Sequence, residues 1–211
     1  MEVSFRGGRR LGATLLLTAV VTVMLGTSTA IAAAFDNIYP TIRSNWVCDD
    51  DVILQEFCLT DGSTVTVYFA STLDSTETSR ISTTLALEYA PTDLSFSVVS
   101  SPDYSGSDST NTIYQQVNSG FGSSTYIGYA WCDEAKNASR CYQHYVRFRY
   151  SSFTQAVACH ETGHSVGLTH GKGASPQQSN TASALGCMRT PILSSYTDLK
   201  TDSTQNINAV Y

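Results

Sequence analysis

Apolar and polar residues alternate in several short stretches of the chain, a pattern typical of β-strands that bury one face. The clearest example is TVTVYFA, in which β-branched and aromatic residues dominate. The predicted strands are residues 64–70, 94–100, 112–117, 125–132 and 145–150. A longer spacing, with Ile81, Leu85 and Tyr89 on one face, predicts a helix over residues 74–90 that stops at Pro91.

Two further helices are predicted in the second half of the chain. One runs over residues 153–166, with Ser151 or Ser152 as its N-cap and Gly167 after its last turn. The other occupies the tail at residues 197–210. The order of strand, helix, several strands, helix, loop and helix predicts an α/β or α+β domain. We favour α+β with a twisted mixed sheet.

The N-terminus has the layout of a secretory signal peptide. Three arginines precede an uncharged run at residues 11–25, and a stretch of small residues with two A-x-A patterns ends at Ala34. A membrane anchor is the alternative, but this run is shorter than the about 20 apolar residues that a membrane span needs. We therefore predict a signal peptide at residues 1–34, one domain at residues 35–211, and a secreted protein.

The charge of the chain disfavours several classes of partner. The chain has 12 basic and 18 acidic residues; without the three arginines and one glutamate of residues 1–34, these counts become 9 and 17, a net charge of −8. An acidic chain with no basic run is a poor ligand for nucleic acid or for anionic membranes. We expect neither nucleic-acid binding nor stable membrane association after signal cleavage.

Six cysteines lie beyond the predicted signal peptide, and an even number in an exported protein indicates disulfides. The sequence alone does not choose among the pairings. We favour pairs of neighbours along the chain, Cys48 with Cys58 and Cys132 with Cys141, the second of which closes an acidic loop at residues 133–140. A cysteine zinc site is disfavoured because the chain has no C-x-x-C pair.

The sequence HETGHSVGLTH contains three of the four histidines of the chain. In a helix, His160 and His164 lie one turn apart, so both imidazoles can reach one zinc ion from the same face. Glu161 is offset from them and faces a zinc-bound water, as the general base of an H-E-x-x-H site. Gly167 lets the chain leave the helix sharply, and His170 then returns as a third ligand. One position stays open, as catalytic zinc requires.

Three other features carry weaker signals. His144 in YQHY is isolated from the other histidines, and we expect a surface or loop residue there. Asn137 begins the sequence N-A-S, a glycosylation sequon whose alternative is an unmodified loop. Clusters of aspartates at residues 49–51 and 103–108 are calcium candidates, but such clusters are more often solvated loops.

The pattern H-E-x-x-H-x-x-G-x-x-H followed by a methionine turn resembles the metzincin family of zinc peptidases. All five motif positions match, and the resemblance spans about residues 158–191. It implies that Met188, in GCMRTP, is the Met-turn residue, an apolar floor beneath the zinc and not a ligand. No tyrosine stands two residues after Met188, so no such role is assigned, and Tyr196 is only a remote candidate.

The resemblance also implies a third disulfide, because Cys159 and Cys187 each adjoin a residue of the site. It implies a metzincin-like fold, similar to matrixins or related small bacterial enzymes, with an active-site helix and a C-terminal helix around a cleft that holds one zinc. The implied activity is endopeptidase hydrolysis of a protein or peptide by zinc-activated water, with Glu161 as the base. We expect a monomer.

The alternative to a peptidase is a secreted zinc-binding domain without peptidase activity that acts as a binding module. A structural zinc domain or a zinc amidase is less favoured.

Overall fold

The computed structural model describes residues 33–40, 47–49, 57–117, 126–150 and 152–211. All but the last two residues of the predicted signal peptide lie outside these ranges, so that segment stays a prediction. Within the described ranges, no helix has both the length and the apolar character needed to span a membrane.

The described strands form one sheet, which is parallel except at one strand. They are β1 (Leu59–Thr60), β2 (Thr64–Phe69), β3 (Ser95–Val98), β4 (Thr112–Val117), β5 (Gly128–Asn137) and β6 (Arg140–Arg149). The order is β1-β6-β4-β2-β3 with parallel neighbours, and β5 pairs antiparallel with β6. The fold is mixed α/β. Its sheet is more parallel than we expected for an α+β domain, because β2, β3 and β4 follow one another through crossovers and not hairpins.

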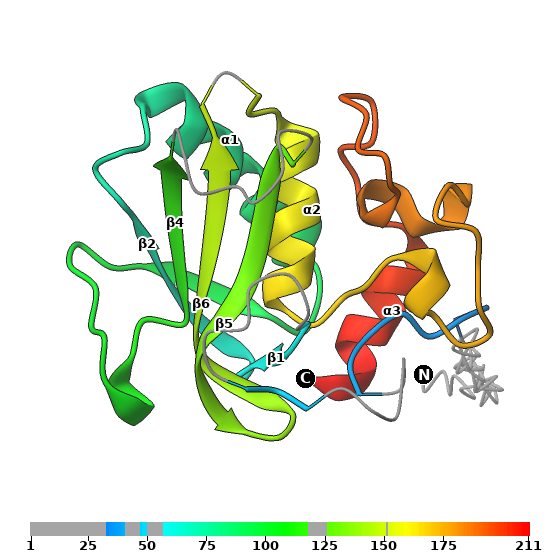
Figure 1. Ribbon diagram of the computed structural model, residues 1–211, viewed down its shortest axis with the longest axis horizontal. Coiled ribbons are helices and arrows are strands. Elements are labelled where there is room, and N and C mark those ends of the chain that lie inside the picture. Colours follow the sequence, from blue (N-terminus) through cyan, green and yellow to red (C-terminus); the bar gives the residue numbers. More distant parts are fainter. Residues whose placement is uncertain (1–32, 41–46, 50–56, 118–125, 151) are drawn as a thin grey trace, which may run out of the picture. The chain divides into compact units, whose positions relative to one another are not determined.

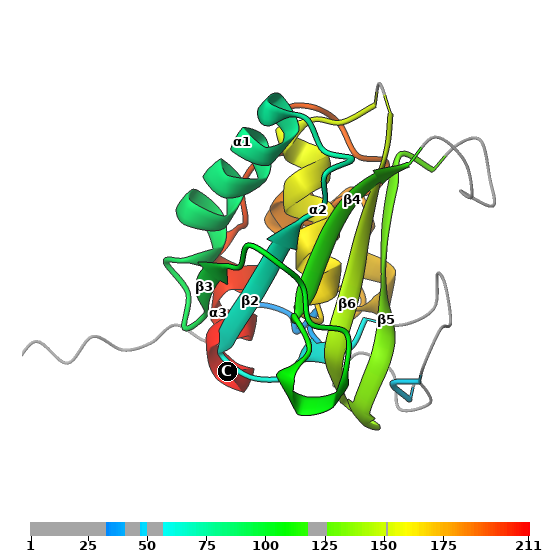
Figure 2. The same cartoon turned by 90° about the vertical axis from the view of Figure 1, so that its left-hand side faces the viewer.

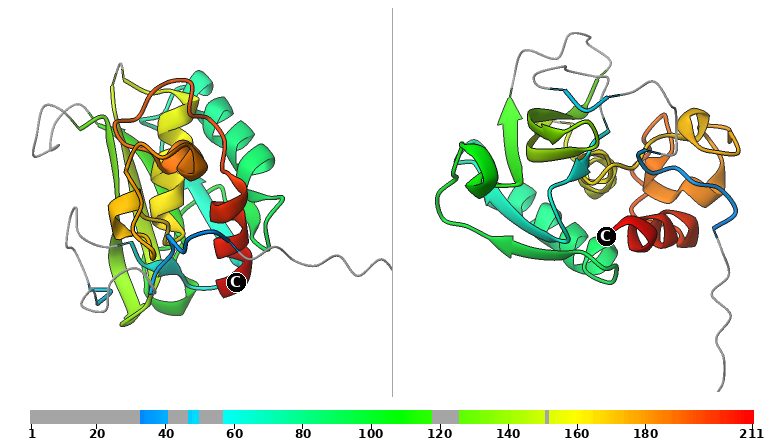
Figure 3. Two further views of the ribbon diagram at one scale, coloured as in Figure 1. Left: turned by 90° about the vertical axis from the view of Figure 1, so that its right-hand side faces the viewer. Right: turned by 90° about the horizontal axis from the view of Figure 1, so that it is seen from below.

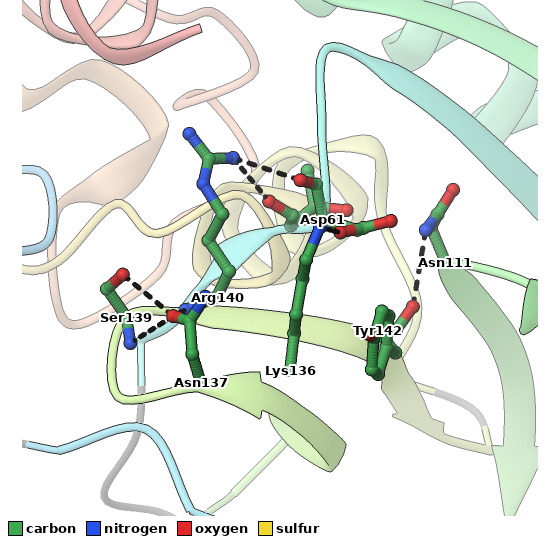
Figure 4. A network of polar contacts seen from close by, with 8 residues as sticks. Asp61, Asn111, Lys136, Asn137, Ser139, Arg140 and Tyr142 are labelled. Atoms are coloured by element: carbon green, nitrogen blue, oxygen red, sulfur yellow. Dashed lines mark hydrogen bonds and ion pairs between the residues drawn. The ribbon is translucent and has the colours of Figure 1, made fainter. Parts of the chain in front are cut away.

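Strands β5 and β6 extend further than the sequence pattern predicts. The expectation of an acidic loop at residues 133–140 is wrong, because these residues form the ends of the two strands and their turn. The side chain of Asn137 accepts hydrogen bonds from the backbone N–H of Ser139 (2.9 Å) and of Arg140 (3.0 Å), which stabilises the turn (Figure 4). Arg140 also donates to the carbonyl oxygen of Thr60 (2.8 Å) and so joins the hairpin to β1. This end of the hairpin is largely accessible to solvent, so its residues do not show the alternation of apolar and polar positions that predicts a strand.

Three α-helices accompany the sheet: α1 (Ser75–Thr84), α2 (Gln155–Ser165) and α3 (Thr201–Val210). A π-helical segment, Leu85–Tyr89, extends α1, and 3-10 turns form at Gly106–Asp108, Gly171–Gly173 and Ser183–Met188. Helices α1 and α2 cover the same face of the sheet (Figure 2). Helix α3 lies on the far side of α2 from the sheet, with the segment that connects the two helices (Figures 1 and 3).

Side-chain caps fix where the first two helices begin. Asp74 and Glu77 form a capping box at α1, in which each side chain accepts a hydrogen bond from the backbone N–H of the other. Helix α2 begins after Thr154, whose hydroxyl accepts from the N–H of Val157. The prediction of Ser151 or Ser152 as this cap was wrong, because residues 152–154 are still outside the helix.

Helix α2 is buried along almost its whole length, so its sequence lacks the separate polar face of a surface helix. Every residue from Ala156 to Ser165 is buried, including His160 and Glu161. One side packs against β5 and β6, and another packs against the 3-10 segment Ser183–Met188. Placing ionisable groups in such a helix is costly unless they are paired or bind an ion.

Three disulfides join the cysteines in order along the chain: Cys48–Cys58, Cys132–Cys141 and Cys159–Cys187. The first two are neighbours in space, with the sulfurs of Cys48 and Cys132 3.7 Å apart. The third ties α2 to the turn that precedes Met188. Because all six sulfurs are in disulfides, none is a thiolate available to a metal.

His144 lies in the interior of the sheet, in β6 between Thr112 of β4 and Cys132 of β5. The expectation of a surface or loop histidine is therefore wrong, because its side chain is fully buried. Burial lowers the pKa of His144 to about 3, so the imidazole is neutral at physiological pH. It lies outside the cleft described below and plays no part in it.

Candidate metal centre

Three histidines bring their Nε2 atoms to one point. The Nε2 atom of His160 lies 3.1 Å from that of His164 and 2.9 Å from that of His170. A zinc ion with nitrogen ligands at about 2.0–2.1 Å in tetrahedral geometry sets its ligand atoms about 3.3 Å apart. The three nitrogens therefore converge closely enough to share one ion.

The local backbone explains why these residues converge. Helix α2 places His160 and His164 one turn apart. Gly167 then ends the helix with a φ of +93°, a conformation that favours glycine, and the chain turns back to place His170 beside the first two histidines. A Cβ atom on Gly167 would also lie 2.8 Å from Cδ2 of Leu59, so this position excludes side chains for a second reason.

Hydrogen bonds at the opposite ring nitrogens fix the tautomers of two histidines. The Nδ1 atom of His160 donates to the carbonyl oxygen of Cys187 (2.7 Å), and that of His164 donates to the carbonyl oxygen of Leu168 (2.8 Å). Each neutral ring then carries a lone pair on Nε2, the atom that points to the centre. Lone pairs about 3 Å apart repel one another, and a cation between them removes that repulsion.

Burial keeps these rings neutral. Desolvation lowers the pKa of His160 to about 3, with a further contribution from His170, and lowers that of His170 to about 4. The pKa of His164 lies well below its usual range, chiefly because of burial. Neutral imidazole is the form that binds a metal, so the donor set fits zinc by chemistry as well as by spacing.

Met188 packs directly against the helix that carries the first two histidines. A Cβ atom on Gly163 would lie 2.3 Å from Sδ of Met188, so the sulfur occupies the space that the glycine leaves. Cys187, which precedes Met188, is held by the disulfide to Cys159 and supplies the carbonyl that orients His160. The segment that contains Met188 is thus tied to α2 by a disulfide bond and to the ring of His160 by a hydrogen bond.

Glu161 lies in the same cleft as the three histidines. Its side chain is only 3% exposed and extends towards Gly128 at the start of β5. Burial raises the pKa of Glu161 to about 8. A carboxyl group with a pKa near neutral can both accept and donate a proton at physiological pH.

The cleft has a volume of about 660 Å³ and walls that are mainly apolar. Residues 126–130 form one wall, and Thr190–Ile192 contribute to another. Phe57 stacks on His164, with ring centroids 4.2 Å apart, and lies edge-on to His170 at 6.0 Å. Apart from Glu161 and the three histidines, none of the described residues that line the cleft is acidic or basic.

Several of these residues have no signal in the sequence. Phe57 and Gly128 are far from the histidine motif along the chain, and only the fold brings them to it.

Two weaker candidates from the sequence lie outside the cleft. Tyr196 does not line the cleft, and its ring stacks under the guanidinium of Arg189 at 3.8 Å. At residues 103–108, one carboxylate oxygen of Asp103 accepts hydrogen bonds from the N–H and hydroxyl of Ser105, as expected for a loop that stabilises itself.

The fold and the site define a mixed α/β protein with a buried three-histidine centre in a cleft. No protein-family model matches the chain, and no curated protein matches it either. Among solved structures, the chain is similar to high choriolytic enzyme 1, a hatching enzyme zinc-protease from the medaka fish Oryzias latipes. The identity is 14%, the TM-score is 0.35, and the match covers 55% of this chain and 51% of that one. The chain spans about half of that enzyme, and so distant a likeness carries no functional argument.

Proposed function

We propose that this chain is a secreted zinc-dependent endopeptidase in which His160, His164 and His170 hold the metal and Glu161 is the catalytic base. One observation carries the proposal. Three neutral histidines point their Nε2 atoms at one position, and the buried carboxyl group of Glu161 lies in the same cleft. A site that only had to bind zinc would not require the carboxylate.

The chemistry divides between the metal and the chain. Zinc, when bound, supplies a Lewis acid that polarises the scissile carbonyl and favours the loss of a proton from water. Glu161 takes the proton of the attacking water and later delivers it to the leaving amine. The position of Glu161 favours this role, because its carboxyl lies in the same cleft as the three histidines.

Strand β5 offers a place for the substrate backbone. Among the described strands β5 is the outermost one beside β6, and its residues 128–130 line the cleft. An extended peptide can add to such an edge through main-chain hydrogen bonds. This arrangement favours a protein or peptide substrate, and the uncharged walls favour apolar side chains near the scissile bond.

Secretion is part of the same proposal. Three disulfides are typical of exported proteins. Together with the N-terminal pattern of residues 1–34, they favour a mature chain that acts outside the cell as a monomer with one zinc ion. Met188 serves as the floor of the site and not as a ligand.

The test combines metal content with cleavage. Wild type, Glu161→Ala and His164→Ala are each measured for bound zinc and for hydrolysis of a quenched-peptide library. We expect about one zinc per chain and chelator-sensitive cleavage for wild type. Glu161→Ala should keep zinc without cleavage, and His164→Ala should lose both. Zinc binding by the wild type with no cleavage of any peptide would favour the binding-module alternative.

A further inference from the structure

Gly128 begins β5 at the point where this strand passes the side chain of Glu161. A Cβ atom on Gly128 would lie 2.7 Å from Oε1, 2.8 Å from Cγ and 3.0 Å from Cδ of Glu161. All three atoms belong to the side chain of Glu161, at or next to its carboxyl group. The backbone of Gly128 does not have a positive φ, so the strand itself does not require glycine here.

We infer that Gly128 is a positioning residue for Glu161: the space left by its missing side chain is what admits the carboxylate to the cleft. Movement of the Glu161 backbone is restricted, because α2 packs against α1, β5, β6 and the segment Ser183–Met188. A methyl group at residue 128 would therefore displace the end of the glutamate side chain and not the helix.

Other glycines of the chain show why this position is distinct. At Gly171 a Cβ atom would lie 2.5 Å from the carbonyl oxygen of Ser179, so a substitution there pushes on backbone. At Gly163 it would meet the sulfur of Met188. At Gly128 the obstacle is the flexible end of the proposed base, so substitution should impair activity much more than it disturbs the fold.

The inference rests on the proposed function for its catalytic part, but the contact itself can be tested without any activity. A double-mutant cycle in thermal unfolding uses wild type, Gly128→Ala, Glu161→Ala and the double variant, all with metal removed. Overpacking against Glu161 should lower the unfolding midpoint by roughly 2–6 °C in the wild-type background. With Glu161 shortened to alanine, the same substitution should cost nothing. If Gly128→Ala alone does not fold but the double variant does, this result would also support overpacking between residue 128 and Glu161.

The catalytic part is tested with peptide cleavage and zinc content. Gly128→Ala should retain one zinc and a KM within about twofold of wild type, while kcat falls about a hundredfold because the base is displaced. Gly62→Ala is the matched control, since a Cβ atom there meets nothing within 4 Å, and it should match wild type in every measurement.

The outcomes separate the two ideas. Equal thermal costs of Gly128→Ala in both backgrounds overturn the inference, whether or not the protein is a peptidase. An unchanged kcat overturns the positioning role even if the thermal effects are coupled, and a change in KM alone shows that the methyl group obstructs substrate instead. If wild type cleaves nothing while the thermal coupling is present, the proposed function fails and the contact stands.

Discussion

Replacing Glu161 by glutamine should change how the stability of the metal-free protein depends on pH. The carboxyl is fully buried, and burial raises its pKa from 4.5 to about 8. At about 1.36 kcal/mol per pKa unit, ionising this group in the folded protein costs up to about 5 kcal/mol. Water that enters the cleft reduces this figure, so we expect an effect of a few kcal/mol.

The sign follows from proton binding in the two states. Between pH 4.5 and about 8, the unfolded chain has lost this proton while the folded protein still holds it. The free energy of unfolding of wild type therefore falls as pH rises through this window. Glutamine cannot ionise, so Glu161→Gln lacks this loss. The histidines of the site have lowered pKa values and act in the opposite direction, but they are present in both proteins and cancel in the difference.

The assay is chemical denaturation of the chelator-treated proteins at several pH values. At pH 5 the two should have similar stability, and at pH 8 Glu161→Gln should be the more stable by a few kcal/mol. Added zinc should reduce the difference in unfolding free energy between the two proteins at pH 8, because a cation beside Glu161 favours the ionised form of its carboxyl. Asp108→Asn, at an exposed carboxyl, controls for the loss of one negative charge. A difference between wild type and Glu161→Gln that is the same at every pH would refute the reasoning.

Two further predictions concern the helix that carries the site. Thr154→Ala removes the hydroxyl that accepts a hydrogen bond from the N–H of Val157. In denaturant titrations this substitution should lower the free energy of unfolding by about 1 kcal/mol, without loss of zinc. A larger cost for Ser152→Ala would contradict the assignment of Thr154 as the cap. Gly167→Ala forces a side chain into a φ of +93° and against Leu59. The substitution should lower the free energy of unfolding by about 1–3 kcal/mol. It should also weaken zinc binding, measured by zinc titration, because it displaces His170. An unchanged zinc affinity would show that the position of His170 does not depend on this turn.

The parts of the fold that the sequence predicts well are those with local patterns. The strands at β2 and β4 and the helix around His160 follow alternation and motif spacing, and they lie within a few residues of their predicted positions. The sequence pattern predicts too short a hairpin for β5 and β6, because the solvent-accessible end of the hairpin is mainly polar. His144 was misplaced for a related reason: a single histidine among polar neighbours carries no local sign that strands will cover it on both sides.

The candidate site shows the same division in chemical terms. Its proposed ligands fall within eleven consecutive residues, so their spacing alone predicts them. The groups that orient them come from elsewhere: the carbonyl of Cys187 aligns His160, the ring of Phe57 covers His164, and the bare backbone of Gly128 leaves space for Glu161. None of these three groups is a residue type that signals chemistry in a sequence. A chain could therefore keep every residue of the motif and still lose the site geometry through a single methyl group on the neighbouring strand.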